Sequence, residues 1–385
     1  AVIEEAGRFG SEVLAPLNKA GDTAGAILKD GEVITPAGWR EAYHQFREAG
    51  WNALTGPEEF GGQNLPEIVS SATSEIWNAA NLAFGLCPLL TMGAIDALKV
   101  YGSKDLLETY LPKMVSGEWT GTMNLTEPHA GSDLAALRTR AEPHDDGTYR
   151  LFGTKIYITY GDHDLTENII HMVLARLPDA PAGTKGISLF LVPKVLVNQD
   201  GSLGERNDVI AAGVEHKLGI HASPTCTMKY GENGGAVGYL VGEENRGLAA
   251  MFVMMNAARL AVGLQGVALA DRATQHAIAY ANERTQGRGP RAKRGEMSPI
   301  IEHADIRRTV MKMRAATNAA RAICLVTARE LDIAERGESK EAREAAHMRA
   351  ALLTPVAKAY STDIGVEVAS LGVQVHGGMG FVEET

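Results

Sequence analysis

The hydrophobic period of this chain changes twice, and the resulting order limits the folds that the chain can adopt. Up to about residue 118, apolar residues such as Trp39, Tyr43 and Phe46 recur at helical spacing. Apolar and β-branched runs between turns then follow, with no helical segment between them, which favours antiparallel pairing. Helical spacing returns at Gly247. We therefore expect an N-terminal α-helical domain (1–118), a central antiparallel β-barrel domain (119–243) and an incomplete C-terminal α-helical bundle (244–385).

The last part of the chain is expected to contain three long helices joined by short links, which together form a bundle. The first of these helices ends near Arg284 and contains Gly263 and Gly266. Each glycine costs about 1 kcal/mol relative to alanine inside a helix, so we expect close packing against another helix to offset that cost. Pro355 is expected to kink the third helix.

Composition excludes several classes of function. The 385 residues carry a net charge of −10, which argues against non-specific binding of nucleic acid. The three cysteines lack metal-ligand or redox spacing, so reduced thiols in a cytoplasmic protein are expected. No apolar run approaches the roughly 20 residues of a membrane span. Because helical sequence begins at Ala1 and a glycine-rich turn leads abruptly to Thr385, we expect a piece of a longer protein.

The segment Met123–Asp133 cannot form a regular helix, since Pro128 disfavours helical backbone before it. It combines the hydroxyls of Thr126 and Ser132 with the open backbone of Gly131. Such a segment can present donors to a flat or phosphorylated ligand. The alternative is a turn in which Ser132 or Asp133 caps the next element.

Five motifs in order along the chain resemble those of the acyl-CoA dehydrogenase family. They are Leu125–Asp133, Lys155–Thr159, Glu215–Gly219, Glu283–Gln286 and Gln374–Gly380. The resemblance implies FAD-dependent α,β-dehydrogenation of an acyl-CoA thioester to the 2-enoyl-CoA, with electrons passed to an electron-transferring flavoprotein. Alternatives on the same fold are an acyl-CoA oxidase or flavin monooxygenase, and a flavin- or acyl-CoA-binding protein without turnover.

The resemblance also implies which residues contact FAD. One group lies along the flavin and its ribityl or pyrophosphate, with Tyr157 as an aromatic shield and Thr159 near N5: Met123, Leu125, Thr126, Gly131, Ser132, Tyr157 and Thr159. A second group would reach the FAD of a neighbouring subunit, in a homodimer or a dimer of dimers: Arg284, Gln286, Gln374, Gly377 and Gly378. The alternatives from the residues alone are an alternating strand for Tyr157 and Thr159 and a charged helix end for Arg284.

The chain departs from the common family pattern after Gln286. Gly287 stands where an aromatic residue is usual, and a basic loop follows that contains Arg288, Arg291, Lys293 and Arg294. This loop either contacts phosphates or is solvated. Together with the run His376–Gly380 and the turn Gly161–Asp164, it resembles a subgroup of larger enzymes that includes 3-methylthiopropanoyl-CoA dehydrogenases. We interpret Asp162–Asp164 as a turn rather than a metal site.

The general base is expected beyond Thr385, because the family's usual glutamate lies in a Tyr-Glu-Gly-Thr segment after the glycine motif. A second family position for the base is occupied here by Ala258, which cannot accept a proton. Its neighbour Arg259 is expected to orient the site. Glu383 or Glu384 is the less favoured substitute for the missing base.

Overall fold

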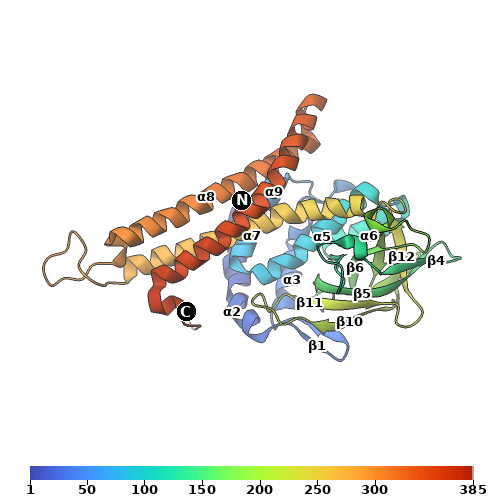
Figure 1. Cartoon of the computed structure of the whole chain (residues 1–385), viewed down its shortest axis with the longest axis horizontal. Helices are drawn as coiled ribbons and strands as arrows, with labels where there is room; N and C mark the ends of the chain where they lie inside the picture. Colours follow the sequence, from blue (N-terminus) through green and yellow to red (C-terminus); the bar gives the residue numbers. More distant parts are fainter. Residues whose placement is uncertain (384–385) are drawn as a thin grey trace. The chain divides into compact units, whose positions relative to one another are not determined.

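The computed structural model describes residues 1–383 (Figure 1). The chain divides into two compact units, which we call the bundle unit (1–10, 66–80 and 259–385) and the sheet unit (11–65 and 81–258). Helices come first along the chain, then strands, then long helices, which confirms the expected fold class. The three expected domain boundaries stay predictions.

The centre of the sheet unit is an eight-stranded sheet in the order β10-β11-β5-β12-β7-β6-β3, with β4 paired to β5. Its strands are β3 (Trp119–Asn124), β4 (Arg140–Pro143), β5 (Tyr149–Thr159), β6 (Asn168–Ala175), β7 (Ser188–Pro193), β10 (Val209–Val214), β11 (Thr225–Tyr230) and β12 (Ala236–Val241). Strands β8 (Val195–Val197) and β9 (Leu203–Arg206) form a separate pair. Pairing is antiparallel as expected, except that β3 and β6 run parallel.

The sheet unit also contains four complete α-helices: α2 (Ala15–Ala24), α3 (Trp39–Glu48), α5 (Leu82–Tyr101) and α6 (Lys104–Ser116). Asn81 caps α5 by accepting a hydrogen bond from the Phe84 N–H at 3.1 Å. Helix α5 packs closely on β3, because a Cβ atom at Gly121 would lie only 2.6 Å from that of Ala94. This packing buries β3, the strand that leads into the Met123–Asp133 segment.

A hairpin interrupts the region for which the spacing predicts only helices. Strands β1 (Ile27–Lys29) and β2 (Glu32–Ile34) pair across Asp30 and Gly31. Both turn residues have positive φ, 52° and 83°, as a two-residue hairpin turn requires. The Asp-Gly dipeptide was therefore the available signal for this hairpin.

The bundle unit contains α1 (Val2–Phe9), α4 (Glu67–Ala80), most of α7 (Gly247–Glu283), α8 (Ala304–Arg336) and α9 (Lys340–His376). Close packing of the two α7 glycines is confirmed. A Cβ at Gly266 would lie 2.2 Å from the Ser361 carbonyl oxygen, and one at Gly263 would lie 2.9 Å from that of Ala357. Helix α9 continues through Pro355 without interruption.

Two helices, α5 and α7, are long and apolar enough to cross a membrane, although the sequence shows no uninterrupted apolar run of that length. Two-thirds of the apolar window of α5 is buried within the protein. Helix α7 contributes Met251 to the core of the sheet unit and Leu264 to that of the bundle unit. Helix α5 thus has the burial of a core helix, whereas only 39% of the apolar window of α7 is buried.

Candidate functional site

Strand β5 carries a bulge at Tyr157. In its pairing with β11, Lys155 lies opposite Met228 and Ile158 opposite Cys226, so two residues of β5 face one residue of β11. Tyr157 has a φ of 60° and an exposed fraction of 61%. The plain alternating strand is therefore not what forms here. An exposed aromatic side chain on unfavourable backbone is a candidate functional residue.

Hydrogen bonds join β3 and the segment after it to the end of β5. The Ile156 N–H donates to the Thr126 carbonyl at 2.9 Å, and the Thr122 hydroxyl donates to the Thr159 carbonyl at 2.8 Å. These bonds place Thr126 beside the bulge. We call the surface formed by Leu125, Thr126, Tyr157 and Thr159 the donor wall.

A buried ion pair lies behind the donor wall. The Lys155 ammonium contacts a Glu127 carboxylate oxygen and the Leu125 carbonyl oxygen, both at 2.9 Å. The side chains of Lys155 and Glu127 are 0% and 2% exposed. Glu127 also accepts hydrogen bonds from the Thr139 hydroxyl and from the N–H groups of Arg138 and Thr139.

Burial and charge shift the pKa values of this pair. Burial lowers the pKa of Lys155 to about 8, although Glu127 opposes that shift. Burial alone would raise the pKa of Glu127, but Lys155 and the hydrogen bonds from Thr139 and Arg138 outweigh it and hold this pKa below 4.5. Both groups are therefore charged at neutral pH. Sequence reasoning placed both residues in motifs but missed that they pair.

The turn after Glu127 shows which of the two candidate capping residues, Ser132 or Asp133, caps the next element. Asp133 accepts a hydrogen bond from the Ala135 N–H at 2.9 Å, so it is the capping residue. Within residues 1–383, the hydroxyls of Ser132, Thr126 and Thr159 have no hydrogen-bond partner in the chain. A Cβ at Gly131 would make only an ordinary 3.7 Å contact with Thr126, so the chain itself does not require glycine there.

The bundle unit brings together the second expected group. Tyr280 near the end of α7 stacks on His376 at the end of α9, with 4.6 Å between ring centroids. The structure thereby gathers the exposed side chains and glycines of this group at one end of the two helices: Arg284, Gln286, Gln374, Gly377 and Gly378. Arg284 donates to the side-chain oxygen of Gln286 at 3.0 Å.

The basic loop after Gln286 is closed at its base. The Gln286 N–H donates to the Ser298 carbonyl at 3.0 Å, and the Ile300 N–H donates to the Arg284 carbonyl at 2.8 Å. Gly287 has a φ of 67°, which explains glycine where an aromatic residue is expected. The basic side chains of the loop are all exposed: Arg288, Arg291, Lys293 and Arg294.

The residues considered for proton transfer are placed as follows. Arg259 is half-buried on α7, next to Ala258. Glu383 is exposed in a turn, and Glu384 lies outside the described residues. A general base beyond Thr385 stays a prediction.

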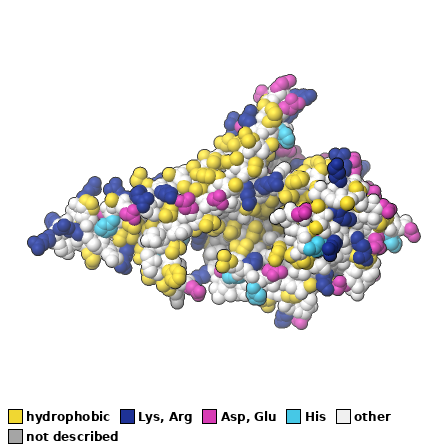
Figure 2. All heavy atoms as spheres, in the orientation of Figure 1, with side chains coloured by type: hydrophobic (Ala, Val, Ile, Leu, Met, Phe, Trp, Pro, Cys, Tyr) yellow, Lys and Arg dark blue, Asp and Glu magenta, His cyan; other side chains and the backbone are white. Residues whose placement is uncertain are grey.

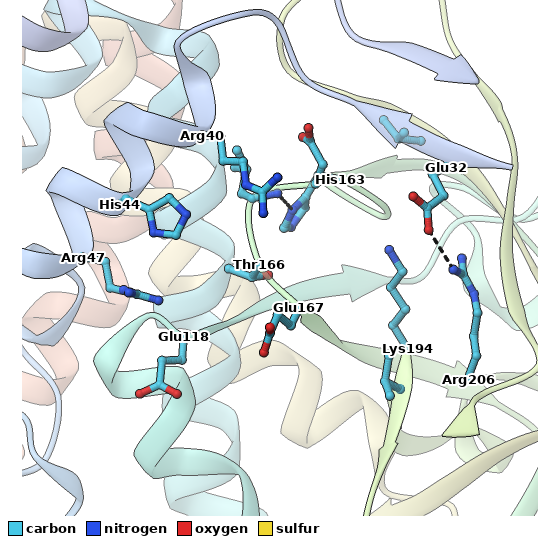
Figure 3. A pocket seen from close by; sticks show the side chains of 14 residues that line it. Glu32, Arg40, His44, Arg47, Glu118, His163, Thr166, Glu167, Lys194 and Arg206 are labelled. Carbon is cyan, nitrogen blue, oxygen red and sulfur yellow. Dashed lines mark hydrogen bonds and ion pairs between the residues drawn. The ribbon is translucent and has the colours of Figure 1, made fainter. Parts of the chain in front are cut away.

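A separate charged pocket of about 640 Å³ lies in the sheet unit between α3 and the Asp162–Asp164 turn (Figure 3). Four Lys or Arg side chains and four Asp or Glu side chains line it, so it has no excess of either charge. Asp162 is held by Lys194 at 2.5 Å, and burial lowers the pKa of His163 to about 3. No group of three or more potential metal ligands occurs within residues 1–383.

Comparison with known proteins identifies relatives of the whole chain. Family models of the N-terminal, middle and C-terminal domains of acyl-CoA dehydrogenase match residues 1–118, 122–232 and 245–385. The chain is 54% identical to 3-methylmercaptopropionyl-CoA dehydrogenase of Ruegeria pomeroyi, covering all of this chain and 65% of that protein. It is 38% identical to a butyryl-CoA dehydrogenase of Syntrophomonas wolfei, covering 97% of this chain and 62% of that protein. The chain thus spans just under two-thirds of these relatives.

Solved structures share the fold at lower identity. A butyryl-CoA dehydrogenase from Megasphaera elsdenii superposes with a TM-score of 0.79 at 23% identity, covering 100% of this chain and 89% of that one. An acyl-CoA dehydrogenase complexed with FAD from Bacillus anthracis superposes with a TM-score of 0.82 at 24% identity, covering 100% and 60% of the two chains.

Proposed function

This chain belongs to the acyl-CoA dehydrogenase family, and on that basis we propose that the full-length protein oxidises an acyl-CoA thioester to the 2-enoyl-CoA with FAD. The observation that carries the proposal is the 54% identity over the whole chain to a named dehydrogenase of this kind. The donor wall supports it independently, because its chemistry suits a flavin.

The residues of the donor wall fit FAD in three respects. Thr126 and Thr159 offer hydroxyls without partners in residues 1–383, and Tyr157 offers an exposed ring. Ser132 offers a third free hydroxyl beside Gly131, where the absent Cβ leaves room for close approach. When bound, FAD would supply the redox chemistry, as the acceptor of the hydride and the carrier of its electrons. Pre-placed donors around its ring stabilise the reduced form.

The second group would hold the phosphate and adenosine end of FAD. Arg284 carries a guanidinium that matches phosphate geometry. A Cβ added at Gly378 would meet no atom within 4 Å, so the space beside this residue is open. We assign this group to the FAD of a neighbouring subunit, so the proposed assembly is a homodimer or a dimer of dimers. Large apolar side chains exposed along α8 and α9 support such an assembly (Figure 2): Met311, Val326, Met348, Leu352, Val356, Val366 and Val373.

The proposed substrate is a short acyl-CoA, either 3-methylthiopropanoyl-CoA or a fatty acyl-CoA. A methylthio group has the size of a short alkyl group, so an apolar pocket discriminates weakly between the two. The proposed electron acceptor is an electron-transferring flavoprotein, and the proposed location is the cytoplasm. The three cysteines, Cys87, Cys226 and Cys324, are free and buried, as a reducing compartment permits.

Anaerobic titration of the full-length, FAD-loaded protein with a panel of acyl-CoAs tests this proposal. We expect bleaching of the oxidised flavin absorbance with one or more short acyl-CoAs and none with free coenzyme A. The enzymatic reading fails if no thioester bleaches the flavin. Reoxidation of the reduced protein by oxygen should be slow, whereas rapid reoxidation would indicate an oxidase or monooxygenase.

A further inference from the structure

We propose that the buried Lys155–Glu127 pair is a positioning device for the flavin: Lys155 fixes the Leu125 carbonyl and thereby the direction of the Thr126 N–H. Neither charged side chain belongs to the exposed surface of the donor wall. The inference rests on the proposed binding of FAD.

The Leu125 carbonyl and the Thr126 N–H belong to the same peptide group, so fixing the carbonyl also fixes the direction of the N–H. No cis peptide bond occurs in the described residues, so the Leu125 carbonyl and the Thr126 N–H point in opposite directions. The Lys155 ammonium holds the carbonyl at 2.9 Å, so the N–H is directed away from the ammonium. That N–H has no partner within residues 1–383. It is therefore available to a ligand on the other side of the peptide.

Glu127 in turn keeps the ammonium in place. Its carboxylate receives four hydrogen bonds, from the Lys155 ammonium, the Arg138 N–H, the Thr139 N–H and the Thr139 hydroxyl. Thr139 directly precedes β4, so the carboxylate is anchored to the rim of the sheet. The ammonium cannot follow the Leu125 carbonyl outward without breaking its contact with this anchored carboxylate.

Stability alone is a weak reason for such a pair. Removing two charges from water is costly, and apolar residues of similar volume often stabilise a core as well or better. An apolar side chain at position 155 could fill the volume but could not hold the Leu125 carbonyl. The function of the pair is thus the orientation of one peptide group.

The test compares two double variants of the full-length protein. Lys155→Met with Glu127→Gln removes both charges of the positioning pair, which avoids a lone buried charge. Lys194→Met with Asp162→Asn is the control, because this second pair is also largely buried, at 12% and 3% exposed, and does not contact Leu125. Each protein is measured for urea unfolding without FAD, for FAD affinity and for flavin reduction potential.

We expect the first double variant to bind FAD at least about tenfold more weakly, the effect of one lost hydrogen bond of about 1.4 kcal/mol. Its flavin potential should become more negative, because a donor to the reduced ring is misplaced. The control should keep its FAD affinity within about twofold and its flavin potential unchanged, even if it unfolds at lower urea concentration.

Unchanged affinity and potential in the first double variant would overturn the inference and leave the proposed function intact. Equal losses in both double variants would also overturn it, since the pair would then act only through stability. If wild-type protein fails to bind FAD, the proposed function and this inference fail together.

Discussion

At the scale of single residues, the backbone of Tyr157 gives the first prediction. Its φ of 60° is unfavourable for residues other than glycine, whereas the exposed side chain contributes little burial. We expect Tyr157→Gly to be more stable than Tyr157→Ala by about 1 kcal/mol. Thr154 lies in the same strand and has an ordinary φ. There the alanine variant should be more stable than the glycine variant, because glycine weakens a strand. Urea unfolding of the four variants checks this, and alanine being preferred at both positions would contradict it.

The second prediction is that the stabilisation of the fold by Glu127 depends on pH, because the pKa of this carboxyl is lowered. A carboxyl with a depressed pKa stabilises the fold fully above its ordinary value of 4.5, and that contribution is lost as pH falls through the folded pKa. Removing one partner of a buried pair costs roughly 3–5 kcal/mol. Glu127→Gln should therefore be much less stable than wild type at pH 7.

The difference in unfolding free energy between wild type and Glu127→Gln should shrink as the pH is lowered below 4.5. Denaturant unfolding at pH 7 and at several acidic pH values measures it. A difference that does not change with pH would show that the loss arises from packing rather than from the charge of Glu127.

A motif that contains the chemistry allows candidate cofactor residues to be named from sequence, as with Thr126, Ser132 and Arg284, and their contacts with FAD stay predictions. Sequence could not show that Lys155 and Glu127 pair, because the contact joins two motifs 28 residues apart. Nor could it separate the two candidate caps: Ser132 and Asp133 have the same capping chemistry, and only the local backbone decides between them.

At the scale of elements, the contact between α7 and α9 depends on glycine. A Cβ at Gly266 would overlap the Ser361 carbonyl, which belongs to the backbone and cannot rotate away. We expect Gly266→Ala to destabilise the protein by roughly 3 kcal/mol, the upper part of the range for overpacking.

Gly7 in α1 is the matched control, since a Cβ there meets no atom within 4 Å. Gly7→Ala should stabilise the protein by up to about 1 kcal/mol through helix propensity. Thermal unfolding of both variants measures the contrast. Equal effects would mean that the two helices can move apart at little cost.

Element type followed from periodicity where runs are long, so the three long helices could be predicted. The β1–β2 hairpin was missed because each strand has only three residues, too few to show a period. The parallel β3–β6 pair could not be foreseen either. The hydrophobic pattern of β3 and of β6 indicates that each strand is buried. It does not give their relative direction, which depends on the connection between them.

At the scale of the whole molecule, the two groups of cofactor residues lie in different units, with Thr126 in the sheet unit and Arg284 in the bundle unit. If each FAD is shared between subunits, two defective variants should complement one another. One variant would carry Thr126→Val with Ser132→Ala, and the other Arg284→Ala with Gln286→Ala. Each alone should bind little FAD.

In a mixed dimer, one site combines both defects and the other combines both intact groups. Random mixing makes half of the dimers mixed, and within these mixed dimers about one site in two should bind FAD again. Bound flavin per chain after co-expression and purification through two different tags measures this fraction. Absence of recovery in verified mixed dimers would place both groups on the FAD of a single chain, and the flavin site would then not require a second subunit.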